Sequence, residues 1–327
     1  MKTILIAGHD LKFLSHIREY LESIKDLTVL IDQWENHAIH DETKSLDLLN
    51  KADIIFCEWG LGNAVWYSSH KKPGQKLIVR MHLQEKDTPF PKRFTVEKID
   101  RICTITPYWY EEFHRLFGFP RKKMRMIYNT VDTQTFDLPK KTGAEFNLGL
   151  LGLVPQRKRL DRALDILEML HPKDRRYKLF IKGKRPEEYE WMKDREREMV
   201  YYDAQYRRIK DAPWRDNVIF DPHGNDIPEW FTKIGWTLSV SDFEGSHQSP
   251  SEGMAAGTVP VLIDWKGAET VYPREFIFAG TAPMADFIHG NHALVGAERL
   301  KAYARKHFDK QVICDKVAHL LIGLGSN

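Results

Sequence analysis

The sequence predicts an α/β protein built from two Rossmann-like, doubly wound domains. The chain has 327 residues, about twice the usual length of a single domain. Short apolar or β-branched runs recur about every 25 residues, a spacing that accommodates a strand and a crossover helix. The pattern restarts after a polar segment near residue 140. Each half of the chain is therefore expected to form its own parallel sheet.

The first half contains the first set of candidate strands. These runs are apolar throughout and do not alternate with polar residues, as expected for parallel strands buried on both faces. Between the first two runs, apolar residues recur every three to four positions from Leu14 to Ile24, which indicates an amphipathic helix. The predicted strands begin near Thr3, Thr28, Asp53, Lys76, Arg101 and Arg125.

The second half repeats this pattern after a predicted linker over residues 137–146, which contain Pro139 and Gly143. Its longest helical stretch is predicted at about Pro186–Lys210. We expect domains over residues 1–136 and 147–300. Helices over residues 301–327 are expected to pack back toward the first domain. The second set of strands begins near Asn147, Lys178, Asn217, Trp236, Val259 and Phe276.

The composition excludes several classes of protein. Hydrophobic residues make up 42% and charged residues 29% of the chain, which excludes wholesale disorder. Apolar runs such as Ile54–Cys57 are too short to span a bilayer, and the N-terminus lacks the features of a signal peptide. Three widely spaced cysteines fit neither a disulfide framework nor a zinc site. We therefore expect a cytoplasmic protein.

The segment richest in chemical groups follows the predicted strand at Trp236–Ser241. Glu244 and Glu252 are separated by seven residues, across a turn and a predicted helix start. Paired carboxylates at the end of a strand suit hydrogen bonding to vicinal hydroxyls of a sugar or a ribose. The stretch Ser249–Glu252 also fits a capping box at the start of the helix. The two interpretations are compatible, because a helix N-terminus also favours an anionic diphosphate.

Three segments together resemble retaining glycosyltransferases of the GT-B fold, in particular glycosyltransferase family 4. The segment from Glu244 to Val261 resembles the family pattern E-G-F-G-x-x-x-x-E-A-M-A-x-G-x-P-V. Asn129–Phe136 resembles N-G-V-D-x-x-x-F at the hinge, and Gly152–Asp161 resembles V-G-R-x-x-x-x-K-G-x-D. The similarity covers about residues 1–310. It implies the GT-B fold, in which two Rossmann-like domains face a central cleft.

The resemblance implies roles on the donor side. Glu244 would bind hydroxyls of the donor sugar, and Glu252 would hold the ribose. Arg157 and Lys158 would neutralise the diphosphate leaving group. Alternatively, the run that these two residues form with Arg159 fits a solvated helix start. Further donor contacts would come from the turn Gly245, Ser246, His247, Gln248 and Ser249.

Other roles fall in the first domain. His82 follows the fourth predicted strand and would face the donor as a catalytic residue. Alternatively, His82 is a structural loop histidine whose hydrogen bonds are satisfied by its neighbours. Four residues at the ends of other strands are expected near the acceptor. These residues are His9, Glu58, Trp59 and Arg80.

The sequence departs from the family pattern at three places. Leu153 replaces the family's arginine, Gly245–His247 replaces G-F-G, and Gly253 replaces the alanine after the second glutamate. These departures leave the donor base and sugar open. The chain contains no Asp-x-Asp motif, so we expect no metal site and no cofactor beyond the nucleotide-sugar co-substrate.

The net charge of +3 conceals an uneven distribution. Residues 1–70 contain 6 Lys/Arg and 11 Asp/Glu, a net of −5, whereas residues 71–126 contain 14 and 6, a net of +8. Aromatic residues lie beside or among these cations, namely Trp66, Tyr67, Phe90 and Phe94. Segment 71–126 is therefore a candidate for contact with anionic lipid at the inner face of the membrane. Ordinary solvated loops are the alternative.

These features predict a glycosyltransferase that moves a sugar from a nucleotide-diphosphate donor to a saccharide or lipid-linked acceptor with retention. The expected setting is surface polysaccharide or lipopolysaccharide assembly. A nucleotide-sugar epimerase or a non-catalytic sugar-nucleotide binder on the same fold is the alternative. The nearly neutral net charge argues against nucleic acid as a partner.

Overall fold

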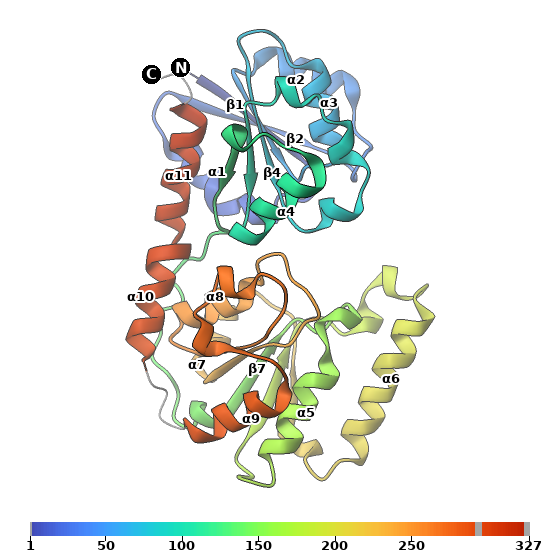
Figure 1. Cartoon of the computed structure of the whole chain (residues 1–327), viewed down its shortest axis with the longest axis vertical. Helices are drawn as coiled ribbons and strands as arrows, with labels where there is room; N and C mark the ends of the chain where they lie inside the picture. The colour runs from blue at the N-terminus through green and yellow to red at the C-terminus, as the bar shows by residue number, and fades with distance from the viewer. Residues whose placement is uncertain (1, 292–295, 324–327) are drawn as a thin grey trace. The chain divides into compact units, whose positions relative to one another are not determined.

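The computed structural model describes residues 2–291 and 296–323 (Figure 1). Its contacts divide the chain into two compact units, Met1–Thr130 with His307–Asn327, and Val131–Lys306. These boundaries differ from the predicted ones at residues 136 and 300. The predicted linker packs on the second unit, because Lys140 Nζ donates hydrogen bonds to the carbonyls of Phe231 (2.8 Å) and Ile234 (2.9 Å).

The first unit contains a parallel sheet. In the described residues it has six strands in the order β2-β1-β3-β4-β5-β6. β1 lies between β2 and β3, and the strand order reverses there, as in doubly wound sheets. The strands are β1 (Lys2–Gly8), β2 (Leu27–Gln33), β3 (Ile54–Glu58), β4 (Lys76–Met81), β5 (Arg101–Thr104) and β6 (Met124–Met126).

Both faces of this sheet are covered by helices (Figure 1). Ile4 and Ile6 of β1 belong to a core that includes residues of α1 and α11, whereas Leu5 and Ala7 belong to a core with α2, α3 and α4. Successive side chains of a strand point to opposite faces, so an apolar run serves both cores. The helices are α1 (Ser15–Ser23), α2 (Glu42–Lys51), α3 (Gly62–His70), α4 (Pro107–Phe117) and α11 (Lys310–Ile322).

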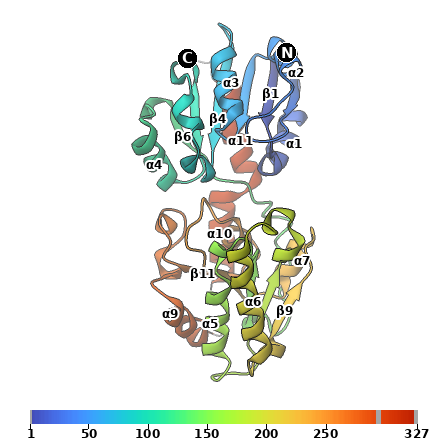
Figure 2. The same cartoon turned by 90° about the vertical axis from the view of Figure 1, so that its right-hand side faces the viewer.

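The chain ends in two helices without a strand, as the sequence predicted over this stretch. Asp309 separates α10 (Ala297–Phe308) from α11, and its side chain accepts a hydrogen bond from the Gln311 amide (2.9 Å). Ile313 and Val317 of α11 are buried against the first sheet. Figure 2 shows α11 behind the strands of this unit. The C-terminal segment therefore completes the core of the first unit.

The second unit contains another parallel sheet. Its described residues form six strands in the order β12-β11-β10-β7-β8-β9. β7 and β10 are neighbours, so the loops at their carboxyl ends lie side by side. The strands are β7 (Asn147–Leu151), β8 (Lys178–Lys182), β9 (Val218–Asp221), β10 (Trp236–Ser239), β11 (Val259–Ile263) and β12 (Ile277–Phe278).

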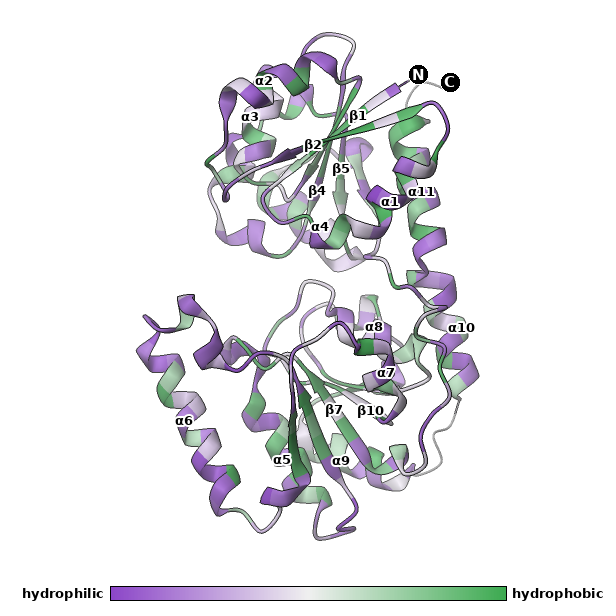
Figure 3. Ribbon diagram, turned by 180° about the vertical axis from the view of Figure 1, so that it is seen from behind, coloured by the Kyte–Doolittle hydropathy of each residue, from purple (hydrophilic) through white to green (hydrophobic). Residues whose placement is uncertain are grey.

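Helices also cover both faces of the second sheet. The ring of Trp236 on β10 contacts Phe287 of α9 (6.0 Å between centroids), and the next residue, Thr237, faces Gly253 of α8. The apolar strands lie inside each unit, and polar residues concentrate on the outer helices (Figure 3). The helices are α5 (Leu160–Leu170), α6 (Glu196–Asp211), α7 (Ile227–Thr232), α8 (Gln248–Ala255) and α9 (Thr281–Gly290).

The predicted helix at Pro186–Lys210 is shorter than expected. Residues 186–192 form two short 3₁₀ turns, and α6 begins only at Glu196. The Glu188 side chain accepts a hydrogen bond from the Arg185 amide (2.6 Å), and Met192 is buried. These local interactions hold the tighter turns in place of a continuous α-helix. No helix in the described part of the chain combines the length and apolar character needed to cross a bilayer.

Candidate functional site

A buried carboxylate lies at the carboxyl edge of the second sheet. Glu244, in the loop after β10, is 5% exposed. Its Oε1 lies 2.6 Å from Lys158 Nζ and 3.3 Å from Arg157 Nη1. The loops are also joined through the backbone, because the Asp242 amide donates to the Arg157 carbonyl (2.9 Å). The structure thus brings Glu244 into contact with Arg157 and with Lys158, which precedes it by 86 positions in the sequence.

The neighbouring cations keep Glu244 ionised. Burial raises the pKa of its carboxyl, but His247, which is charged only at low pH, and the permanent charges of Lys158 and Arg157 outweigh this effect and hold the pKa well below its ordinary value. Lys158 and Arg157 are 16% and 29% exposed. Each contacts a carboxylate, so this segment is not the solvated helix start considered above. Glu244 can accept hydrogen bonds at neutral pH and cannot act there as a general acid.

Glu252 does not cap its helix. α8 begins at Gln248 with His247 as its N-cap residue, and no side chain makes a capping hydrogen bond there. The capping box predicted over Ser249–Glu252 is therefore wrong. No hydrogen bond or ion pair of the Glu252 carboxyl is found among the described residues. Burial raises its pKa to about 8. This carboxyl is available to a ligand.

A buried tyrosine holds the turn between the two glutamates. The Tyr272 hydroxyl lies 3.1 Å from the carbonyl oxygen of Ser246 and 2.8 Å from that of the next residue. It also lies 2.9 Å from Ser251 Oγ. Gly245 and Gln248, at the two ends of the turn, are half-buried. The turn predicted to approach the donor is thus anchored from the protein side.

His247 occupies the centre of this arrangement. Its Nδ1 lies 2.6 Å from Ser239 Oγ, and its Nε2 lies 3.5 Å from Ser249 Oγ and 3.8 Å from Glu244 Oε1. Burial and the nearby Lys158 lower the pKa of the imidazole to about 3. The ring is therefore neutral throughout the physiological range.

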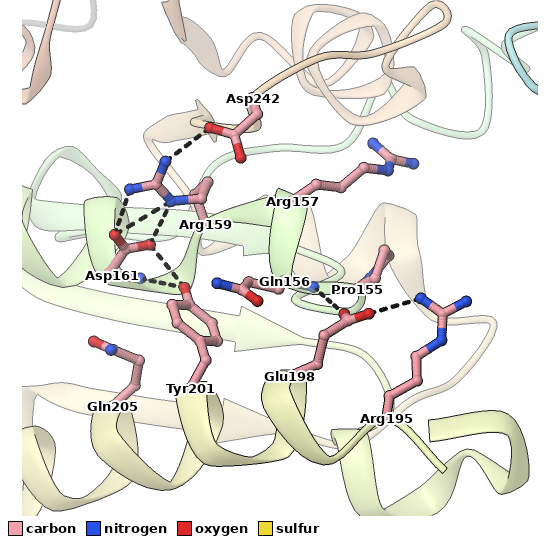
Figure 4. A pocket seen from close by; sticks show the side chains of 10 residues that line it. All are labelled: Pro155, Gln156, Arg157, Arg159, Asp161, Arg195, Glu198, Tyr201, Gln205 and Asp242. Carbon is pink, nitrogen blue, oxygen red and sulfur yellow. Dashed lines mark hydrogen bonds and ion pairs between the residues drawn. The ribbon is translucent and has the colours of Figure 1, made fainter. Parts of the chain in front are cut away.

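A pocket of about 590 Å³ adjoins Arg157 within the second unit (Figure 4). Its charged groups largely compensate one another: Arg159 pairs with Asp161 (2.7 Å) and Asp242 (2.8 Å), as Figure 4 shows. Tyr201 donates a hydrogen bond to Asp161 (2.7 Å). The volume lies within the usual range of small-molecule pockets. The lining residues are Pro155, Gln156, Arg157, Arg159, Asp161, Arg195, Glu198, Tyr201, Gln205 and Asp242.

The first unit contains a second cluster, at the ends of β3 and β4. Glu58 Oε1 accepts hydrogen bonds from Arg80 Nη1 and His82 Nε2, both at 2.8 Å. Arg80 Nη2 also donates to Asn129 Oδ1 (2.5 Å). Burial raises the pKa of Glu58, but Arg80 and His82 outweigh it and the pKa is lowered. Glu58 and Arg80 are 0% and 1% exposed, so neither offers a surface to an acceptor.

His82 itself presents a different face. Its Nε2 is bound to Glu58, as the interpretation of a satisfied loop histidine predicts, whereas its Nδ1 has no hydrogen-bond partner among the described residues. The ring packs against Trp59 (4.1 Å between centroids) and Phe13 (5.3 Å). The ring centroids of His9 and Trp59 lie 5.9 Å apart. His82, Trp59 and His9 therefore form one aromatic cluster, with Nδ1 of His82 as an available acceptor.

The loop after His82 is held by another buried carboxylate. Glu85 Oε1 accepts hydrogen bonds from the amides of Gly60 (2.8 Å) and His82 (2.9 Å). Burial raises the pKa of this carboxyl. In the described residues, Glu85 Oε2, Glu58 Oε2 and Arg80 Nε are buried without a hydrogen-bond partner. Such groups are costly and concentrate where a protein positions functional side chains.

Comparison with known proteins identifies the architecture. No protein-family model and no curated protein matches the sequence. Among solved structures, HepE of Anabaena, solved with UDP, matches 98% of this chain and 99% of its own with 14% identity and a TM-score of 0.72. A glycosyltransferase from Rickettsia africae matches 100% and 99% with 12% identity and a TM-score of 0.71.

A third match is sucrose-phosphate synthase from Thermosynechococcus elongatus, with 12% identity, 98% of each chain and a TM-score of 0.72. These matches extend over nearly the whole chain and therefore include both of its parallel sheets.

The chain has the GT-B fold. In this GT-B chain the donor-side candidates Glu244, Arg157, Lys158 and His247 converge on one edge of the second sheet. The described residues contain no group of three or more His, Cys, Asp or Glu side chains that could hold a metal ion.

Several cations of the basic segment 71–126 are paired within the first unit. Lys71 and Arg121 form ion pairs at 2.6 Å with carboxylates of the same unit. Lys123 Nζ donates to three backbone carbonyls. Tyr67 and Phe94, which the sequence analysis counted among the aromatic residues of a surface, are buried in the core of the GT-B first unit. That part of the prediction is wrong, because an aromatic residue between strands most easily buries its area in the core.

Several residues of the candidate site carry no local sequence signal. Ser239, Trp265 and Tyr272 support His247 and its turn from β10 and from the segment after β11. Asn129 reaches Arg80 across 49 positions. The hinge motif includes Asn129, but nothing near Trp265 or Tyr272 in the sequence indicates a contact with the turn. Only the fold brings these side chains together.

Proposed function

We propose that this protein is a glycosyltransferase that transfers a sugar from a nucleotide-diphosphate donor to a saccharide or lipid-linked acceptor, with retention at the anomeric carbon. The observation that carries the proposal is the buried Glu244 carboxylate with Lys158 at 2.6 Å and Arg157 at 3.3 Å. This cluster lies at the carboxyl edge of an open α/β sheet, where such folds bind ligands.

The cluster suits the departure of a nucleoside diphosphate. Cleavage of the bond between sugar and phosphate develops negative charge on the leaving oxygen. Lys158 and Arg157 are cations held in place before the reaction, so they can stabilise this charge with little reorganisation. Glu244 is ionised and accepts hydrogen bonds from sugar hydroxyls. Glu252, half-buried and without a partner in the described chain, is assigned to the ribose diol.

A uridine nucleotide is the first donor to test. HepE, which matches nearly the full length of this chain, was solved with UDP, with UDP and glucose, and with UDP-glucose. These ligands support a nucleotide-sugar donor for this protein.

The acceptor is assigned to the cluster of the first unit. His9 and Trp59 are its acceptor-side residues, and His82 beside them, which the family resemblance implies faces the donor, offers Nδ1 as a hydrogen-bond acceptor. Saccharides bind through hydrogen bonds combined with aromatic packing, and this cluster offers both. Glu58 and Arg80 orient His82 from within the unit. The setting implied by the family resemblance is the assembly of surface polysaccharide or lipopolysaccharide.

The decisive experiment measures diphosphate release from a panel of nucleotide sugars, with and without saccharide acceptors. Glu244→Gln and Lys158→Met are expected to lower kcat by about 10²–10³-fold, the usual cost of losing one charge-stabilising group. Glu269→Gln and Lys266→Met, which change exposed side chains of the same unit, serve as matched controls. Unchanged rates in the site variants would contradict the assignment.

Other outcomes separate the alternative functions. An epimerase would change the sugar without releasing diphosphate. A non-catalytic binder would bind the nucleotide sugar in calorimetry and release nothing.

The same reaction can be used to test metal independence and stereochemistry. We expect EDTA to leave the initial rate unchanged, because Arg157 and Lys158 carry the charge that a divalent ion carries elsewhere. Proton NMR of the first product should show the anomeric configuration of the donor. A rate that falls with EDTA and recovers with Mg²⁺, or an inverted product, would contradict these two parts of the proposal.

A further inference from the structure

His247 adopts a backbone conformation that favours glycine. Its φ is +30° and its ψ is 87°, in the left-handed region, where a side chain is strained. In the pattern that this segment resembles, the corresponding position is the second glycine of G-F-G. The chain therefore carries a buried imidazole, 7% exposed, at a position where the backbone alone would favour no side chain. Strain of this kind destabilises the folded chain and points to a role for the side chain.

The hydrogen bonds of the imidazole determine which nitrogen carries its proton. Trp265 Nε1 donates to Ser239 Oγ (3.0 Å), because an indole N–H can only donate. Ser239 Oγ lies 2.6 Å from His247 Nδ1, and this nitrogen is the acceptor within reach of the serine proton in the described chain. The network Trp265–Ser239–His247 therefore leaves Nδ1 unprotonated and places the ring proton on Nε2.

The Nε2–H is directed toward the candidate donor site without a short partner. It lies 3.8 Å from Glu244 Oε1 and 3.5 Å from Ser249 Oγ, distances too long for strong hydrogen bonds. One oxygen atom placed beside both Nε2 and Glu244 Oε1 can lie about 2.8 Å from each. A hydroxyl group suits this position, because it accepts from Nε2–H and donates to the carboxylate. A ligand lacking that hydroxyl would leave the buried Nε2–H without a short hydrogen-bond partner.

We propose that His247 is a specificity-determining residue, and that its Nε2–H and the Glu244 carboxylate together bind one hydroxyl of the transferred sugar. The proposal rests on the function proposed above and specifies how the sugar of its nucleotide-sugar donor is recognised. Ser239 and Trp265 are positioning residues that hold the tautomer. Because the imidazole is neutral, it donates one hydrogen bond without adding positive charge beside Lys158 and Arg157.

The experiment is a thermodynamic cycle that combines the substitution of His247 with the removal of single hydroxyls from the donor sugar. The UDP-hexose with the highest wild-type turnover is compared with its 2-, 3-, 4- and 6-deoxy forms by UDP release, in wild type and in His247→Gly. In wild type, loss of one particular hydroxyl should lower kcat/KM by at least about 100-fold. In His247→Gly the parent donor should lose about 10–100-fold, and the penalty at that position should shrink by a similar factor. Ser239→Ala should give a smaller loss with the same positional pattern.

Two controls separate recognition from folding. Glycine suits the backbone at position 247, and calorimetric binding of UDP, which lacks the sugar, should stay within about twofold of wild type. Asp26→Gly makes the same change at another left-handed residue (φ 63°) in the first unit and should not affect turnover. Equal deoxy penalties in wild type and His247→Gly would overturn the inference while leaving the transferase assignment intact. A wild type that turns over no nucleotide sugar would instead overturn the proposed function.

Discussion

Three residues with left-handed backbone conformations lie in the candidate sites. Trp59, Arg159 and His247 have φ values of 65°, 56° and 30°. Trp59 packs on His82, Arg159 pairs with Asp242 in the loop after β10, and His247 lies beside Glu244. Non-glycine residues persist in this region only where the surrounding contacts hold them. Of these residues, Trp59 and His247 are side chains to which we assign a role in binding, whereas Arg159 supports the loop after β10 and another left-handed residue, Asp26, lies outside the sites.

A prediction at the residue scale concerns the raised pKa of Glu252 and its effect on stability. Its folded pKa of about 8 lies above its ordinary value of 4.5, so the folded protein binds this proton more tightly than the unfolded chain does. The resulting stabilisation is complete below about pH 4.5 and is lost as the pH rises through about 8. Glu252→Gln cannot ionise, and we expect it to raise the midpoint of thermal unfolding by several degrees at pH 8.5 and hardly at all at pH 5.

The matched control is Glu269→Gln, an exposed glutamate of the same unit. A pH-independent shift in Glu252→Gln, or the same pH dependence in the control, would show that Glu252 does not carry this raised pKa. Glu252→Gln should also weaken UDP binding at pH 8.5, where the ionised carboxylate, unlike glutamine, offers two acceptor oxygens to the ribose.

At the scale of elements, strand ends and crossing helices determine what each unit can do. β7 and β10 are neighbours in the second sheet, and this adjacency brings Lys158 to Glu244 across 86 residues. In the first unit, β3 and β4 pair Glu58 directly with Arg80. α11 comes from the far end of the chain and completes the core on one face of the first sheet. The first unit therefore depends on residues that follow the second unit in sequence.

This dependence predicts the effect of a core substitution in α11. Ile313 is 0% exposed and packs with Ile4 and Ile6 of β1. We expect Ile313→Ala to lower the free energy of unfolding by about 2–4 kcal/mol, through lost apolar burial and the cavity left behind. Hydrogen exchange should accelerate at the amides of β1 and β3 and remain unchanged in β7 and β10.

Lys316→Ala, on the exposed face of the same helix, is the control and should change stability by less than about 0.5 kcal/mol. Equal protection of β1 in Ile313→Ala and wild type would mean that α11 does not stabilise the first sheet.

At the scale of the whole molecule, the net charge of +3 conceals segments of opposite net charge, −5 over residues 1–70 and +8 over residues 71–126. Segment 71–126 carries a net of +8, yet several of its cations are paired with carboxylates or backbone carbonyls within the unit. Lys92 and Arg93 remain exposed, and the Arg93 guanidinium lies 5.9 Å from the ring of Phe90. The expected contact with anionic lipid therefore depends on the cations that remain exposed, among them Lys92 and Arg93.

We expect the protein to sediment with vesicles containing phosphatidylserine at low salt and to be released as the salt concentration rises. Lys92→Glu combined with Arg93→Glu should lower the partition coefficient at least about tenfold, since each basic residue near the surface contributes about 1 kcal/mol. Lys210→Glu combined with Lys266→Glu makes the same change of net charge in the second unit. Equal losses in both double variants, or no binding by wild type, would remove the membrane from the list of partners.

The alternation of apolar runs and helical patterns was sufficient to predict both sheets. The central strands are buried on both faces, so their sequences are largely apolar, and this signal is local. The carboxyl ends of strands were also predictable as the place of the polar site residues, because β10 and β7 end just before Glu244 and Lys158. The helix at Pro186–Lys210 and the capping box at Ser249 were mispredicted. Local hydrogen bonds hold 3₁₀ turns over residues 186–192, and α8 begins at Gln248, one residue before the predicted cap.

The sequence by itself determined the two parallel sheets, the segments that follow their strands and the identity of the candidate donor-side residues. Only the tertiary structure decided which of these side chains are buried, which are paired and which remain available. Glu58 and Arg80 became internal supports of His82, and His247 acquired a fixed tautomer from Ser239 and Trp265. The physical reason is that periodicity and propensity act over a few residues, whereas hydrogen bonds and burial depend on partners tens of positions away.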